Sequence, residues 1–375
     1  MLLMNYLFFL SLSFLFISCS SLPKEPQKIS LHFLDEYVYP INQTIKKTKI
    51  GGLSGIDYKN GIYYLAVDDS KTPRYCKAKI NIQNDTISEI NFIDVVIFKD
   101  DPYYQNHVLD IESILAAPNN KIIMVSEGAI NNDKDPLLFS AKENGEFIKD
   151  FQLPTKFLAS TNSKPVHNAT LEGLSHGIDD KGYWTAFELP LPIDGEEPKY
   201  QKANSPVRFT YFDKETGKPS KEFVYQLSAI TKPNKGGFNI NGVTDILEFK
   251  ANHFFVIERT YQSDYFGYGN TVNIYYAYAD SSTTNSLVID SLKSTAYIPL
   301  NKKLLFEFDA IKSELTEGII DNIEGITFGP ILNNGNQSLI LVADDNFQVF
   351  GKQLNQFILL EIEQQAGKYS SKSSH

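Results

Sequence analysis

A pair of strands that opens and closes with polar residues recurs five times along this chain of 375 residues. In the last copy, Asp321-Asn-Ile-Glu-Gly-Ile leads through an Asn- and Gly-rich segment to Leu339-Ile-Leu-Val-Ala-Asp-Asp-Asn-Phe347. The earlier copies begin at Leu53, Ile111, Leu171 and Val243, and they end at Asp69, Glu127, Glu188 and Arg259. Hairpins repeated at intervals of about 60 to 80 residues are typical of a β-propeller, in which each blade is one antiparallel sheet.

The repeats predict an all-β chain that forms a β-propeller with five recognisable blade repeats and five or six blades. Leu31–Tyr39 and Gln356–Ile362 are predicted to be strands. We expect them to pair within one blade and close the ring, because an open ring would leave an unpaired sheet edge. No break in composition divides residues 29–363, so they are expected to form one domain. Six segments rich in Pro, Asn, Gly, Asp or Tyr are expected to be long loops near the channel mouth: 100–107, 128–136, 155–168, 190–205, 229–239 and 261–270.

The first residue of each hairpin should lie beside the last, because the two strands of a hairpin are antiparallel. The opening positions are Ser54, Glu112, Glu172, Thr244 and Glu324, and the closing positions are Asp68, Glu127, Glu188, Glu258 and Asp344. Eight of these ten residues are acidic, so a ring of carboxylates is expected at one mouth of the channel. Crowded carboxylates raise each other's pKa or recruit cations, and their oxygens suit Ca²⁺ or Mg²⁺. Alternatively, each carboxylate accepts hydrogen bonds from backbone N–H groups of its own turn.

Arginines occur close to the predicted ring. Arg74 lies just beyond Asp68-Asp69, Arg259 follows Glu258, and Arg208 begins an outer strand. Guanidinium groups bind phosphate or carboxylate through paired hydrogen bonds. These arginines therefore indicate either a site for an anionic substrate or simple neutralisation of the neighbouring acidic residues.

The stretch Gly173-Leu-Ser-His-Gly177 matches the G-x-S-x-G pattern of serine esterases. That pattern needs a strand, a sharp turn and then a helix, whereas Ile178-Asp-Asp-Lys-Gly-Tyr-Trp184 predicts a turn into another strand. We therefore expect Ser175 to be an ordinary strand residue.

The first 18 residues carry no charged side chain, and Leu15-Phe-Ile-Ser-Cys19 resembles the cleavage site of bacterial lipoproteins. We expect residues 1–18 to be a signal peptide, Cys19 to be the lipidation site and residues 19–28 to be a tether. An uncleaved membrane anchor is the alternative. Both interpretations predict a location in the cell envelope, at the periplasmic or outer-membrane face. Residues 364–375 are expected to be a disordered tail.

The charge and the cysteine content limit the partners of the chain. A net charge of −10 argues against nucleic acid as the main partner. If Cys19 is lipidated, Cys76 has no second cysteine with which to form a disulfide. We expect a monomer that meets the membrane through its lipid anchor.

Several of these motifs resemble the phytase-like family, whose members bear the label "esterase-like activity of phytase" and are mostly secreted or lipid-anchored bacterial proteins. The motifs are Gly52-Leu-Ser-Gly-Ile-Asp57, Asp68-Asp69, Arg74-Tyr75, Leu171-Glu-Gly-Leu174, Glu258-Arg259, Asn322-Ile-Glu-Gly-Ile326 and Asp344-Asp-Asn-Phe347. The resemblance extends over residues 50–360 approximately, with one departure: Ser70 follows Asp68-Asp69 where the family usually has Arg. It implies a hydrolase of phosphoesters or esters.

Together these observations predict a membrane-tethered hydrolase of small anionic, phosphorylated or ester substrates. It is expected to use a divalent cation, with calcium as the first candidate. The predicted catalytic residues are Glu172, Glu324, Arg74 and Arg259. The predicted metal ligands are Asp68, Glu112, Glu127, Glu188, Glu258 and Asp344. Two alternatives remain: a non-catalytic propeller that binds a ligand or protein around a structural ion, and a lactonase-like propeller that cleaves esters with one metal.

Overall fold

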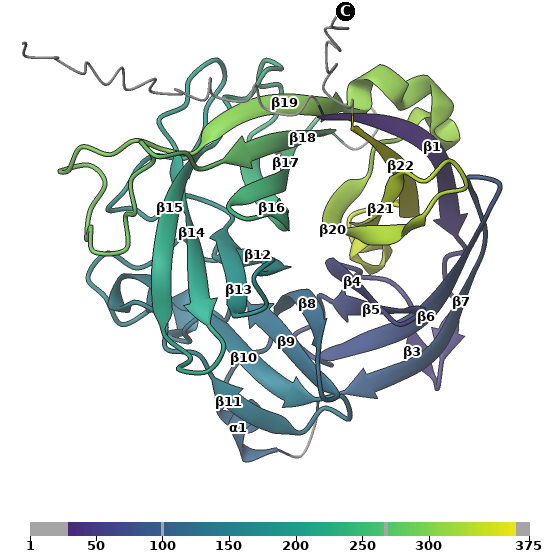
Figure 1. The fold of residues 1–375 in the computed structure, drawn as a ribbon, viewed down its shortest axis with the longest axis horizontal. Coiled ribbons are helices and arrows are strands. Elements are labelled where there is room, and N and C mark those ends of the chain that lie inside the picture. The colour runs from purple at the N-terminus through teal and green to yellow at the C-terminus, as the bar shows by residue number, and fades with distance from the viewer. Residues whose placement is uncertain (1–28, 99–100, 266–268, 365–375) are drawn as a thin grey trace, which may run out of the picture.

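The structure, a computed structural model, describes residues 29–98, 101–265 and 269–364. In this part of the chain, five four-stranded antiparallel sheets surround a central axis (Figure 1). The prediction of an all-β propeller is therefore confirmed, with five blades. The predicted signal peptide, tether and tail lie outside the described residues, except that Gln364 belongs to the last strand. No helix among the described residues is both long and apolar enough to cross a membrane.

The strands of each blade follow one another outward from the channel. The first blade contains β4 (Gly55–Lys59), β5 (Ile62–Val67), β6 (Arg74–Gln83) and β7 (Thr86–Ile97). The second contains β8 (Ile111–Ala117), β9 (Lys121–Ser126), β10 (Leu137–Lys142) and β11 (Phe147–Asp150). The third contains β12 (Leu171–His176), β13 (Gly182–Phe187), β14 (Pro206–Asp213) and β15 (Pro219–Gln226). The fourth contains β16 (Asn239–Lys250), β17 (His253–Gln262), β18 (Asn270–Tyr278) and β19 (Asn301–Glu307).

The fifth blade joins the two ends of the described chain. It contains β20 (Asn322–Ile331), β21 (Gln337–Asp344), β22 (Asn355–Gln364) and, outermost, β1 (Ile29–Tyr39). β1 pairs with β22 from Ile29 opposite Gln364 to Tyr39 opposite Asn355. The predicted closure of the ring by the terminal strands is confirmed.

Short elements occupy the connections between the strands. They are β2 (Thr44–Ile45), β3 (Thr48–Lys49), α1 (Pro102–Asn106), η1 (Ile130–Asn132), η2 (Thr155–Phe157), η3 (Phe308–Glu314), η4 (Thr316–Gly318) and η5 (Asn346–Gln348). Three of the predicted loops therefore contain a helical turn. Two others, 229–239 and 261–270, are shorter than predicted because β16, β17 and β18 extend into them.

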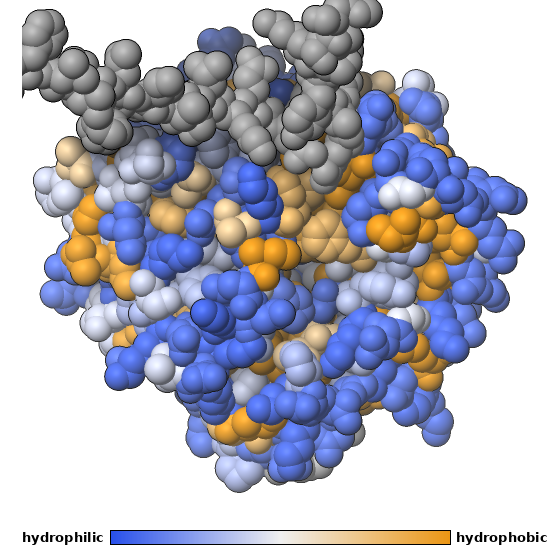
Figure 2. Space-filling view, in the orientation of Figure 1, coloured by the Kyte–Doolittle hydropathy of each residue, from blue (hydrophilic) through white to orange (hydrophobic). Residues whose placement is uncertain are grey.

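Burial explains why inner and outer strands have different sequences. The run Leu339–Ala343 in β21 is wholly buried, because inner strands pack against the neighbouring blades on both faces. In β7, which is outermost, buried Ile90 and Phe92 alternate with exposed Glu89 and Asn91. Hydrophilic side chains cover most of the face in Figure 2, and apolar residues form separate patches there.

The channel is narrow because the innermost strands approach one another closely. A Cβ atom on Gly325 would lie 3.0 Å from Cα of Gly55 in the first blade. A Cβ atom on Gly55 would in turn lie 2.7 Å from Cα of Ser113 in the second blade. Only glycine leaves room for such contacts between backbones. The channel is therefore constricted at the level of these glycines.

Side chains from other blades hydrogen-bond the free inner edges of the innermost strands. Asp245 of β16 accepts hydrogen bonds from backbone N–H groups of Leu174, 3.1 Å away in the third blade, and Ile326, 2.9 Å away in the fifth. Asp57 of β4 accepts one from the N–H of Ala116 in the second blade at 2.8 Å. These carboxylates connect neighbouring blades across the channel.

Replacing Asp245 with alanine should destabilise the whole propeller. The change would leave the buried N–H groups of Leu174, Ile246 and Ile326 without their side-chain acceptor. Each such group costs about 1–3 kcal/mol, so a loss of at least ~2 kcal/mol is expected. Chemical denaturation measures the free energy of unfolding, with exposed Asp290→Ala as the control. Equal stabilities of the two variants would contradict this role.

Candidate functional site

The opening residue of the hairpin lies at a β-bulge in four blades, and in three of these it is a glutamate that reaches the channel mouth. In β8, the pairing skips Glu112, since Ile111 lies opposite Ser126 and Ser113 lies opposite Val125. The same shift in register occurs at Glu172, Thr244 and Glu324 in their blades. A bulge inserts an extra residue and redirects its side chain.

In each of these hairpins, the closing residue directly follows the residue that pairs with the position before the bulge. This register corrects the predicted closing residue of the fourth blade. In the fifth blade, Ile323 pairs with Ala343, and Asp344 follows. In the fourth blade, Val243 pairs with Glu258, so Arg259 occupies the position equivalent to Asp344. The predicted ring of acidic side chains is therefore interrupted by an arginine.

Glu258 points away from the pocket, so its predicted place in the ring is wrong. Its carboxylate accepts hydrogen bonds from Tyr225 Oη at 2.6 Å and from the Ser228 N–H at 3.1 Å, and it forms an ion pair with Lys302. Successive side chains of a strand point in opposite directions, so only one of Glu258 and Arg259 can face the mouth. Glu258 instead stabilises contacts between the third and fourth blades.

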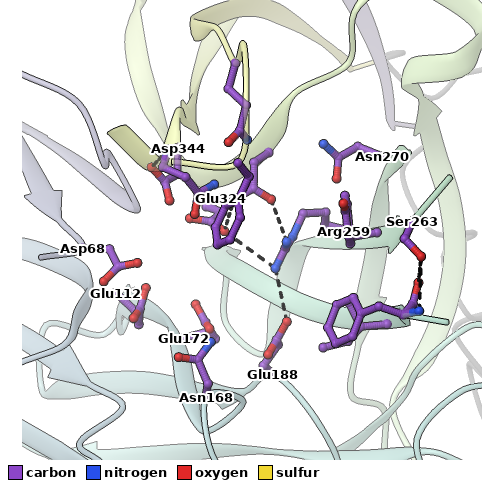
Figure 3. Close-up of a pocket in the computed structure, with 17 residues that line it drawn as sticks. Asp68, Glu112, Asn168, Glu172, Glu188, Arg259, Ser263, Asn270, Glu324 and Asp344 are labelled. Carbon is purple, nitrogen blue, oxygen red and sulfur yellow. Dashed lines mark hydrogen bonds and ion pairs between the residues drawn. The ribbon is translucent and has the colours of Figure 1, made fainter. Parts of the chain in front are cut away.

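A pocket of about 500 Å³ lies at the channel mouth (Figure 3). Six carboxylates line it: Asp68, Glu112, Glu172, Glu188, Glu324 and Asp344. Among the described lining residues, Arg259 is the one cationic side chain. These predicted site residues, which come from all five repeats, therefore meet at one place, although their chemical roles stay predictions.

Arg259 lies between two of the carboxylates, as Figure 3 shows. Its Nη2 atom is 3.3 Å from Glu188 Oε1 and 3.6 Å from Glu324 Oε1. Its Nη1 atom donates to Asn322 Oδ1 at 2.6 Å. The guanidinium thus compensates the charge on one side of the pocket, between the third and fifth blades.

The pKa values of the pocket carboxyls are raised. Burial raises the pKa of Glu188 to about 7, against the opposing effect of Arg259. Burial also raises the pKa of Glu324 to about 8, and Arg259 again opposes the rise while Asp68 and Glu188 add to it. Burial and neighbouring carboxylates raise the pKa of Glu112 and Glu172 well above the usual range. The pocket would therefore gain stability from bound protons or cations.

Two groups of three carboxylates on the other side of the pocket could hold a cation. Asp68, Asp110 and Glu112 form one group, and Glu112, Glu127 and Glu172 form the other. Within each group, one oxygen from every residue lies within 4.8 Å of the others. These donors are all carboxylate oxygens, so they fit Ca²⁺ or Mg²⁺ and lack the nitrogen and sulfur ligands typical of zinc.

Two members of these groups differ from the sequence prediction. Asp110 was not predicted, because it directly precedes β8 rather than opening or closing the hairpin. Its position two residues before Glu112 was the available signal. Glu127 does not line the pocket; it is buried, and its Oε1 atom accepts the Thr170 N–H at 2.5 Å. Its other carboxylate oxygen could therefore bind a cation.

Arg74 is buried among residues of its own blade and Phe347 and does not line the pocket, so its predicted position at the pocket is wrong. It is 2 % exposed and donates to Asp69 Oδ2 at 2.6 Å and to the Thr72 carbonyl at 2.8 Å. The ring of Phe347 lies 5.3 Å from its guanidinium carbon. Arg208 is likewise buried, between Asp194 and Glu222.

Ser175 is fully buried in β12, as the sequence predicted for a strand residue. Its Oγ atom accepts the Glu248 N–H at 2.8 Å and donates to the His176 carbonyl at 3.1 Å. β12 continues through a turn into β13 rather than into a helix. The G-x-S-x-G match is therefore not a nucleophile elbow.

The fold and the site define a five-bladed propeller with an acidic pocket at its channel mouth. The family described as "Phytase-like: Esterase-like activity of phytase" matches residues 48–347. The chain therefore belongs to the phytase-like family, as the motifs suggested. No curated protein matches the sequence significantly.

Several solved structures are similar to the chain at low sequence identity. The allergen Mala s 1 of Malassezia sympodialis is 9% identical, with a TM-score of 0.42 and coverage of 86% of this chain and 82% of that one. RS223-β-xylosidase is 11% identical, with a TM-score of 0.42 and coverage of 84% and 93%. An exo-1,5-α-L-arabinanase from a bovine ruminal metagenomic library is 11% identical, with a TM-score of 0.39 and coverage of 84% and 92%.

Without divalent cations, the stability of the protein should fall as the pH rises from about 4.5 to about 8. The pKa values of Glu188 and Glu324 are raised from 4.5 to about 7 and about 8. The folded chain therefore holds protons that the unfolded chain has released in this window, so rising pH favours unfolding. Thermal denaturation in chelator should show the decline, and Ca²⁺ should reduce it.

Glu324→Gln should flatten this pH dependence, because a neutral amide does not titrate. Exposed Glu314→Gln serves as the matched control and should retain the wild-type slope. A melting temperature in chelator that rises between pH 5 and pH 8 would contradict the raised pKa values.

Proposed function

We propose that the chain is an extracytoplasmic hydrolase of phosphoester or carboxyl ester substrates. The reaction takes place in the acidic pocket and uses a divalent cation, for which calcium is the first candidate. The observation that carries this proposal is the pair of carboxylate groups sharing Glu112, whose oxygens lie within 4.8 Å of one another in each group. The description of its family, which names an esterase-like activity, supports the same class of reaction.

The two sides of the pocket suggest different tasks. The side of the pocket away from Arg259 would hold the cation, because the described residues that line it provide no basic side chain. The ligands would be Asp68, Asp110, Glu112, Glu127 and Glu172. A divalent cation, when bound, polarises an ester oxygen and lowers the pKa of a coordinated water. The pKa values of four of these carboxyls are raised, so they would release protons when the cation binds: Asp68, Glu112, Glu127 and Glu172.

Glu324 and Glu188 would move protons during hydrolysis. Their pKa values of about 8 and about 7 are close to neutral pH, where a carboxyl can both accept and donate a proton. Arg259, held between them, would orient an anionic or carbonyl oxygen of the substrate through its guanidinium. Glu172 lies on the cation side, so we assign it to cation binding rather than to base catalysis.

Removing one shared ligand should abolish hydrolysis. Glu112→Gln replaces a charged ligand of both groups with a neutral amide, and it should lower turnover by at least ~100-fold. Hydrolysis of p-nitrophenyl phosphate and p-nitrophenyl acetate with Ca²⁺ measures this loss, and chelation of the wild-type protein should reproduce it. Exposed Glu314→Gln is the matched control.

Two results would contradict cation-dependent hydrolysis in this pocket. Loss of activity in Ser175→Ala, with the fold intact, would restore the serine mechanism. Calorimetric binding of Ca²⁺ without hydrolysis in a broad panel of esters would instead support a non-catalytic propeller that binds a ligand around a structural ion.

We also propose that a lipid on Cys19 attaches the protein to the cell envelope. The proposal rests on the uncharged apolar run that ends at Leu15-Phe-Ile-Ser-Cys19. In a Gram-negative host, the wild-type protein should incorporate radiolabelled palmitate, and Cys19→Ala should not. Labelling of Cys19→Ala at the wild-type level would refute the assignment, and Cys76→Ala serves as the control.

A further inference from the structure

Four large apolar or aromatic side chains line the acidic pocket, three of them from the fourth blade and the segment before it. Phe238, Ile240 and Tyr261 line the pocket there, and Phe350 lines it from the loop between β21 and β22. We call these four residues the apolar wall. Phe350 is 78% exposed and Phe238 is 57% exposed. Large apolar side chains that line a pocket and are exposed favour an apolar ligand, because covering them removes apolar surface from water.

The wall exists because the hairpin of the fourth blade is longer than those of the other blades. Beyond the pair of Gly242 and Arg259, β16 and β17 continue with Ile240 opposite Tyr261 and Asn239 opposite Gln262. In the fifth blade, by contrast, pairing of β20 with β21 ends at the equivalent level, where Asn322 lies opposite Asp344. The extension therefore rises above the ring of carboxylates.

Hydrogen bonds fix the position of Phe238 at the end of this extension. The Ser263 N–H donates to the Phe238 carbonyl at 2.9 Å, and the Phe238 N–H donates to Ser263 Oγ at 3.2 Å. The rings of Phe238 and Tyr261 lie 5.9 Å apart, centre to centre. Binding against Phe238 therefore requires little further ordering of the backbone at this position.

The charge of the pocket restricts what can lie beside this wall. Six carboxylates and one guanidinium line the pocket, so the pocket would stay negative with one divalent cation bound and would repel a ligand with many phosphates. Arg259 is one step along β17 from the extension, and its Nε atom has no partner among the described residues. A ligand with a single polar group near Arg259 and an apolar group against the wall satisfies both features.

We propose, resting on the proposed function, that the substrate is a monoester with one apolar acyl or alkyl group. This group packs on the apolar wall, and the ester lies between Arg259 and the carboxylates. Hydrolysis breaks the bond between the ester oxygen and the acyl carbon or phosphorus. The hydroxyl of water bonds to that carbon or phosphorus to give an acid, and the other proton of water goes to the ester oxygen, which leaves as an alcohol. A polyphosphorylated polyol does not fit this arrangement.

A series of esters tests the proposal in the presence of Ca²⁺. Phe238→Ala/Phe350→Ala should lower kcat/KM for p-nitrophenyl hexanoate by about tenfold or more. The value for p-nitrophenyl acetate should change by less than about threefold, because the two esters share the nitrophenyl leaving group and the acetyl group is too short to cover the wall. The matched control is Val288→Ala, which removes an 89% exposed side chain that does not line the pocket. An equal loss for both esters, or faster hydrolysis of inositol hexakisphosphate than of the hexanoate, would overturn the proposal.

A binding measurement separates this proposal from the proposed function. Calorimetry should show hexylphosphonate binding the wild-type protein at least about tenfold more tightly than methylphosphonate, and the double variant should lose this difference. Equal affinities in the wild-type protein would overturn the apolar subsite even if esters are hydrolysed. If the difference is found and no ester is hydrolysed, the proposed function fails and the apolar ligand class stands.

Discussion

The free inner edge of each blade is the constraint on which this propeller depends. The innermost strand has no further strand to pair with, and its buried N–H groups need acceptors. Asp57, Asp245 and Ser175 supply them from other blades, and glycines such as Gly325 let the strands come close enough. Because these acceptors connect neighbouring blades at the channel, they hold the blades together where the channel is constricted.

A stable ring explains how the chain can hold so many carboxylates in one place. Burial of Glu112 and Glu172, together with repulsion from neighbouring carboxylates, raises their pKa values and opposes folding. Burial of apolar side chains between blades offsets this cost. For example, Trp184 packs edge-on against Phe254, with 5.1 Å between the ring centres. The uneven distribution of charge then gives the pocket a side suited to a cation and a side organised by Arg259.

The sequence was sufficient to predict the propeller, its closure and most pocket carboxylates, because repeated hairpins bring equivalent residues to one end of the sheets. It did not reveal the bulges, so the assignment at Glu258 was off by one residue and Arg259 took the expected place of an acid. Arg74 was misplaced because contacts distant in sequence, such as its bond to the Lys49 carbonyl, determine its environment. The apolar wall depends on hairpin length, which residue patterns define poorly.

The pairing of β1 with β22 also determines how the molecule faces its surroundings. β21 ends at the pocket with Asp344, so antiparallel β22 runs away from the pocket toward Gln364, and Ile29 lies opposite Gln364. Whatever holds the protein just before Ile29 therefore holds it by the side remote from the pocket. If the protein is attached at that end to a bilayer, a bead or a sensor chip, the pocket opens toward the bulk solution. Ligands would then reach it by diffusion.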